Sequence, residues 1–180
     1  MEHIAMLDRW LHIVAGVMWI GLLYYFNFVQ VPALAAANAE ANSGGPGPAA
    51  ITKYVAPRAL FWFRYAALVT WLSGMAYLSI WPDYSVLNVF SFGYAAPLPP
   101  DVPHIRLTNI GFGTWLGTIM AFNVWFLIWP NQKKILGMVP ADDATKAKAR
   151  RVAFLASRTN TMLSIPMLMF MQSGTHGLPF

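Results

Sequence analysis

Histidine is the residue type in this chain best suited to hold a metal or a cofactor, and four are present: His3, His12, His104 and His176. His12 lies in RWLHIVAGVMWIG (residues 9–21), a run so apolar that it resembles a segment built for lipid. An ionisable side chain at membrane depth is costly unless it has a partner. We therefore expect His12 to be paired with a specific group.

Imidazole is a common axial ligand of haem iron, and helical bundles build such sites from facing side chains. We expect His12 to ligate the iron of a haem b, with His176 or His104 as the second ligand. Arg9 and Arg106 are placed to pair with the haem propionates. The alternative is that His12 hydrogen-bonds a neighbouring helix, while the other histidines are interfacial and solvated.

A second group of polar side chains lies in the same apolar segments of the chain, in the half of each segment that is farther from the histidines. We expect its members to converge on an inner polar cavity, where two arginines without a nearby carboxylate can hold an anion or a planar polar ligand. The alternative is structural, with hydrogen bonds between helices and arginines that reach lipid phosphates. The members of this group are Asn27, Arg64, Asn123, Arg158 and Asn160.

Composition places the chain among membrane proteins. Of its 180 residues, 57% are hydrophobic and only 11% are charged, whereas about a quarter of the residues in a soluble domain are charged. The chain has no cysteine. Disulfides, thiolate metal sites, thiol catalysis and covalent haem attachment through C-x-x-C-H are therefore excluded for these residues.

Four segments approach the roughly 20 apolar residues that cross a bilayer as a helix. We expect them to form an all-α, four-helix transmembrane bundle in which residues 1–180 make a single integral-membrane domain. The sequence contains no internal repeat that would indicate a second domain. The four predicted spans are residues 10–31, 59–80, 107–129 and 152–171.

Proline and glycine mark the expected connections. Residues 33–50 are rich in Ala, Gly and Pro, and their composition predicts a flexible linker. Pro32, Pro57 and Pro130 fall at the ends of predicted spans, where a missing N–H does little harm. Pro166 lies inside the fourth span and is expected to kink it.

Basic residues predict the orientation. Lys and Arg flank the second span at its start and fill the connection between the third and fourth spans, whereas the opposite side has only Arg9 and Arg106. By the positive-inside rule, both termini then lie on the outer, periplasmic side of a bacterial inner membrane, as do all four histidines. The net charge of +5 is thus a topology signal, and no nucleic-acid partner is expected.

Three stretches carry a resemblance to a known family: RWLHIVAGVMWIGLLYYFNFVQVPAL, NVWFLIWPNQKKILG and SRTNTMLSIPMLMFM. They resemble the N-terminal membrane region of the bacterial membrane-bound urate oxidases, also called urate hydroxylases. That family joins this region to a C-terminal cytochrome c domain and passes electrons from urate into the respiratory chain. Without a C-x-x-C-H motif, we expect this chain to be a short stand-alone form that lacks the cytochrome c domain.

The resemblance and the histidines together predict a membrane redox subunit that relays electrons to a periplasmic cytochrome c or to a larger respiratory or photosynthetic complex. One alternative is a non-enzymatic accessory subunit that docks on such a complex. Another is urate oxidation, with electrons passed to a separate cytochrome c. That activity needs Arg64 or Arg158 to hold urate, and the sequence offers no evident general base for it. Membrane lipid is an expected partner in every case.

Overall fold

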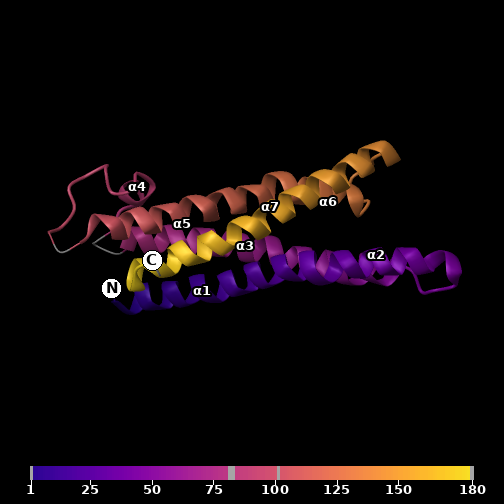
Figure 1. Cartoon of the computed structure of the whole chain (residues 1–180), viewed down its shortest axis with the longest axis horizontal. Helices are drawn as coiled ribbons and strands as arrows, with labels where there is room; N and C mark the ends of the chain where they lie inside the picture. The colour runs from indigo at the N-terminus through magenta and orange to yellow at the C-terminus, as the bar shows by residue number, and fades with distance from the viewer. Residues whose placement is uncertain (1, 81–83, 101, 179–180) are drawn as a thin grey trace. The chain divides into compact units, whose positions relative to one another are not determined.

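The computed structural model describes residues 2–80, 84–100 and 102–178, with the backbone alone at residues 42 and 174–176. This part of the chain is helical and contains no strand (Figure 1), so the predicted all-α class is confirmed. The α-helices are α1 (Glu2–Tyr24), α2 (Val31–Glu40), α3 (Ala56–Ile80), α4 (Val86–Phe90), α5 (His104–Phe122), α6 (Trp129–Ile135) and α7 (Asp143–His176).

Two helical stretches of the described chain, Glu2–Glu40 and His104–Ile135, are long and apolar enough to cross a membrane. They contain the first and third predicted spans. The second and fourth predicted spans lie inside α3 and α7. Arg64 and Arg158, together with hydroxyl and amide side chains around them, make these two helices less apolar.

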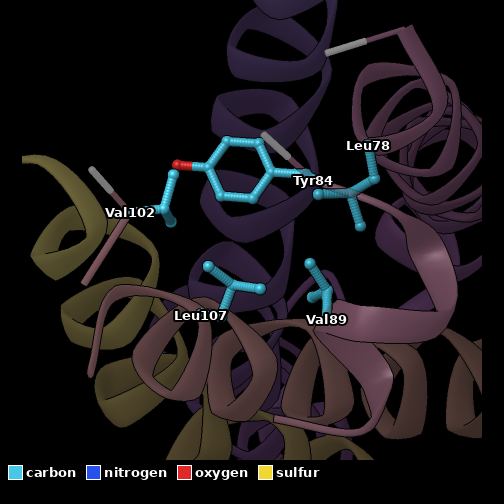
Figure 2. Packing of buried hydrophobic residues seen from close by; sticks show 5 residues of the cluster. All are labelled: Leu78, Tyr84, Val89, Val102 and Leu107. Atoms are coloured by element: carbon cyan, nitrogen blue, oxygen red, sulfur yellow. The ribbon is translucent and has the colours of Figure 1, made fainter. Parts of the chain in front are cut away.

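The chain divides into two compact units. Unit 1 comprises Met1–Ala15, Leu68–Ala121 and Met162–Phe180, and unit 2 comprises Gly16–Ala67 and Phe122–Thr161. The core of unit 1 gathers around α4, where the Tyr84 ring packs among aliphatic side chains from α3, α4, α5 and the connecting loop (Figure 2). Its members are Leu78, Tyr84, Val89, Val102 and Leu107.

A close approach between α4 and α5 requires a glycine. A Cβ on Gly111 would lie 2.6 Å from the carbonyl oxygen of Val89 and 2.8 Å from the ring of Phe92. Phe92 itself has a left-handed φ of 59°, a conformation that is strained for a bulky residue and is maintained only by its surroundings. Gly111 thus lets the turn after α4 pack directly on α5.

Unit 2 contains three π-helical segments, and each is followed by a proline two residues later. The segments η1 (Tyr25–Gln30), η3 (Ile51–Val55) and η4 (Asn123–Ile128) precede Pro32, Pro57 and Pro130. A proline inside a helix removes one N–H and clashes with the carbonyl four residues earlier, and the wider π turn relieves this clash. These prolines therefore lie within helical stretches, where the sequence analysis placed span ends.

The predicted flexible linker is largely helical. Helix α2 continues to Glu40 and is followed by a 3₁₀ turn, η2 (Ala41–Ser43), because alanine has the highest helix propensity of all residues. The irregular part begins at Gly44, whose φ of 85° is left-handed. Helix α7 likewise extends beyond the predicted fourth span at both ends and continues through Pro166.

Candidate functional site

The partner of His12 is the backbone of α3. Its Nδ1 atom lies 2.8 Å from the carbonyl oxygen of Thr70 and 3.3 Å from Oγ of Ser73. A carbonyl oxygen can only accept a hydrogen bond, so Nδ1 of His12 carries the ring proton and donates a hydrogen bond to the Thr70 carbonyl. In the neutral ring, Nε2 is then the nitrogen with the free lone pair. No described residue hydrogen-bonds this atom.

A glycine opens the space in which the His12 ring packs. A Cβ on Gly74 would lie 3.0 Å from Cε1 and 3.3 Å from Nδ1 of His12. The ring is half-buried against α3 by this contact and by the Thr70 bond. Its orientation is thus fixed against α3 by a hydrogen bond to Thr70 and by the close approach of the ring to Gly74.

Asp8 is a neighbour of His12 that the sequence analysis did not select. It stands one turn earlier on α1, and its Oδ2 atom is buried without a hydrogen-bond partner in the described part of the chain. The spacing of Asp8 and His12 predicts this proximity, since a carboxylate and a histidine four residues apart share one face of a helix. The Asp8 carboxylate interacts electrostatically with the His12 imidazole.

His104 has different surroundings. It is exposed at the start of α5, its Nδ1 lies 3.3 Å from Oγ1 of Thr108, and its ring centroid is 4.5 Å from that of Tyr94. No described contact joins it to His12. Within the described residues, no group of three or more His, Cys, Asp or Glu side chains is arranged to hold a metal ion.

The other predicted haem contacts have varied positions. His176 ends α7 in unit 1, and its side chain lies outside the described residues. His3 and Arg9 are exposed on α1. Arg106 is half-buried, with its guanidinium carbon 5.4 Å from the centroid of the Tyr84 ring and its Nε buried without a hydrogen-bond partner in the described chain. Its pairing with a propionate stays a prediction.

The predicted inner polar group is partly assembled in unit 2. Nδ2 of Asn27 donates to the Leu23 carbonyl at 2.9 Å and to Oγ of Ser157 at 2.8 Å. Nδ2 of Asn123 donates to Oδ1 of Asn160, also at 2.8 Å. These three asparagines are buried. Their hydrogen bonds tie the π-helical segments η1 and η4 to one stretch of α7.

The two arginines of the predicted inner polar group, Arg64 and Arg158, lie outside the asparagine cluster. The Arg64 guanidinium carbon stacks 3.7 Å from the centroid of the Trp129 ring. Arg158 is exposed, with its guanidinium 5.2 Å from the Phe154 ring. Neither arginine lines the cavity of unit 2 described next. The reason is that an aromatic face is available to each guanidinium, and cation–π stacking keeps it outside the asparagine cluster.

Unit 2 contains a cavity of about 550 Å³. Its walls are mainly aliphatic and aromatic, and Arg150 is the one ionisable side chain among the described residues that line it. Gln30 lines this cavity, and its Oε1 is buried without a hydrogen-bond partner in the described chain. The polar lining residues are Asn27, Gln30, Asn38, Thr52, Gln132, Arg150 and Ser157.

Comparison with known protein families shows to which family the chain belongs. The model of the urate oxidase N-terminal family matches residues 1–86 and 101–180, which is most of the chain. The chain belongs to the urate oxidase N-terminal family. The family expected from three sequence stretches is thereby confirmed. No curated protein and no solved structure matches the chain.

Proposed function

We propose that this member of the urate oxidase N-terminal family is a membrane redox subunit that binds haem b through His12. The observation that carries the proposal is the hydrogen bond from Nδ1 of His12 to the Thr70 carbonyl. Metal-binding histidines generally donate their second ring N–H to a carbonyl or carboxylate, which fixes the tautomer and the ring orientation. With Nδ1 engaged by this bond, His12 would hold the haem through Nε2.

The second ligand in this proposal is His176. It ends α7 and belongs to unit 1, as His12 does, whereas His104 is engaged by Thr108 and Tyr94. Bound haem would supply one-electron transfer, with its potential set by the axial ligands and by burial. Arg9 and Arg106 would then neutralise the propionates.

The proposal places four spans in a bacterial inner membrane, with both termini on the periplasmic side. Two helices of sufficient length and apolarity support a membrane location, and the basic connection between α6 and α7 supports the orientation. Electrons would leave to a separate periplasmic cytochrome c or to a larger respiratory or photosynthetic complex.

Haem content tests this proposal. The chain is expressed with ample haem precursor, purified in mild detergent, and its haem is quantified against protein by pyridine haemochrome. We expect close to one haem per chain in the wild type and in His3→Ala, and a large loss in His12→Ala. Haem-free wild-type protein that is folded and helical would overturn the proposal and favour an accessory subunit without a cofactor.

The cavity of unit 2 favours a second candidate function, the binding of urate. Urate is a planar anion that carries N–H donors. The Arg150 cation in the cavity wall complements its charge, and the polar side chains of the wall complement its N–H groups. Calorimetric titration with urate tests it. We expect Arg150→Gln to weaken binding by about tenfold, as loss of one charge-assisted contact does, and the exposed Arg151→Gln to leave binding unchanged. Equal affinity in both variants would contradict this candidate.

A further inference from the structure

We infer that Arg64, Trp129 and Lys133 form a binding site for a phosphoryl anion, supplied either by a phospholipid headgroup or by free phosphate. The site lies wholly in unit 2, on α3 and α6. None of its three residues belongs to the asparagine cluster or lines the cavity beside Gln30. Neither the family match nor the proposed redox function assigns a role to these three residues.

Two cations share one indole ring. The guanidinium carbon of Arg64 lies 3.7 Å from the centroid of the Trp129 ring, and Nζ of Lys133 lies 5.8 Å from the same centroid. Lys133 stands one turn after Trp129 on α6, so both side chains leave the same face of that helix. Arg64 is further enclosed by Tyr65, whose ring centroid is 5.1 Å from its guanidinium carbon. The stacking restricts the orientation of the guanidinium plane.

Neither cation is neutralised within the described chain. No carboxylate forms an ion pair with Arg64 or Lys133, and neither side chain hydrogen-bonds a described residue. Unit 2 as a whole is strongly basic, since its acidic residues are Glu40, Asp142 and Asp143 alone. Two like charges gathered on one ring repel each other, and an anion between them removes that repulsion.

The chemistry of Arg64 and Lys133 favours a phosphoryl group as the bound anion. Guanidinium presents a planar fork of N–H donors that matches two phosphate oxygens, and ammonium adds a compact point charge. All three side chains are half-buried, so the charges are less screened than on an open surface. Trp129 is the last residue of the third predicted span, and tryptophan is enriched at the level of lipid headgroups. A lipid phosphate and a free phosphate present the same oxygens to this site.

Binding measurements on the full chain in a neutral detergent test the inference. Short-chain phosphatidylglycerol, short-chain phosphatidylcholine and inorganic phosphate are titrated separately and followed by native mass spectrometry. The variants are Arg64→Gln, Lys133→Gln and Lys134→Gln. The last removes an equal charge next to the site but makes no described contact with the Trp129 ring. Circular dichroism and gel filtration verify the fold of each variant, and Arg64→Lys replaces Arg64→Gln if the latter does not fold.

The wild type and Lys134→Gln are expected to bind phosphatidylglycerol equally, and about tenfold more tightly than the Arg64 and Lys133 variants, as expected for loss of one charge-assisted contact. The same variant pattern with inorganic phosphate, and none with phosphatidylglycerol, supports the site and assigns it to free phosphate. Equal losses in all three charge variants would show a diffuse basic surface and overturn the inference. Affinity unchanged in the Arg64 and Lys133 variants would also overturn it.

Discussion

Nδ1 of His12 and the carbonyl oxygen of Thr70 lie 2.8 Å apart, joining α1 to α3 inside unit 1. The bond determines which ring nitrogen of His12 is protonated and leaves Nε2 as the free acceptor. Because its acceptor is a backbone carbonyl, no side-chain substitution at residue 70 removes the bond directly. The geometry around it can be perturbed through Gly74 instead.

We predict that Gly74→Ala displaces the His12 ring and weakens haem binding. The added Cβ would lie 3.0 Å from Cε1 of His12, and relieving such crowding in a packed site costs about 1–3 kcal/mol. Haem affinity in detergent, measured by titration of the apo-protein, should therefore fall by about tenfold or more. The control is Gly117→Ala, because nothing lies within 4 Å of a Cβ at that position. Equal affinities for the two variants would show that Gly74 does not position His12.

Gly111→Ala is expected to destabilise unit 1. The new Cβ would lie 2.6 Å from the Val89 carbonyl oxygen, and because this atom is backbone, the turn after α4 must move. We expect a loss of about 1–3 kcal/mol of unfolding free energy, measured by denaturant titration in mixed micelles. Gly117→Ala again serves as the control. Unchanged stability of Gly111→Ala would mean that α4 does not pack on α5 in this way.

Asn123→Ala tests the polar tie between η4 and α7. Asn123 donates to Oδ1 of Asn160, which is fully buried, and removing the donor of a buried hydrogen bond costs about 1–3 kcal/mol. Asn131→Ala is a matched control, because its side chain donates only to the Leu127 carbonyl one turn earlier, at an exposed position. The comparison uses the same denaturant titration. A larger loss in Asn131→Ala than in Asn123→Ala would contradict the described pairing.

The start of α7 should be sensitive to acid. Oδ1 of Asp142 accepts the Thr145 N–H at 2.7 Å, as an N-cap does. Hydrogen bonds from the Thr145 side chain and then from its N–H lower the pKa of Asp142 below the ordinary value of 3.8. Since the folded pKa is the lower one, this stabilisation is complete above pH 3.8 and is lost as the pH falls through the folded pKa.

The measurement is the pH dependence of unfolding between pH 6 and pH 2, compared between the wild type and Asp142→Asn. Asparagine still caps a helix but does not ionise, so the variant should lose less stability on acidification. Asp143→Asn, one residue later at an exposed position, is the control. Identical acid profiles for the wild type and Asp142→Asn would show that Asp142 does not contribute through its charge.

The all-α class and the family could be predicted from sequence because both depend on extended patterns: long apolar runs and three distinctive stretches. The prolines were harder to interpret. Pro32, Pro57 and Pro130 suggested span ends, because sequence shows the missing N–H but not the π turn that accommodates it.

The partners of His12 could not be predicted. Thr70 acts through its backbone carbonyl and Gly74 through a missing side chain, and neither property leaves a mark in a single sequence. Of the predicted inner polar group, Asn27, Asn123 and Asn160 are buried and hydrogen-bonded within unit 2, since buried amides in helices need partners. Arg64 was misplaced, because its stacking on Trp129 depends on the packing of α3 against α6. Arg150 was counted as a loop charge, although it lines the cavity of unit 2.

The most direct test of the central claim is the reduced-minus-oxidised optical spectrum of His12→Ala with and without added imidazole. We expect sharp α and Soret bands in the wild type, their loss in the variant, and their return when added imidazole replaces the missing side chain. Wild-type bands in the untreated variant would contradict the assignment of His12 as an axial ligand.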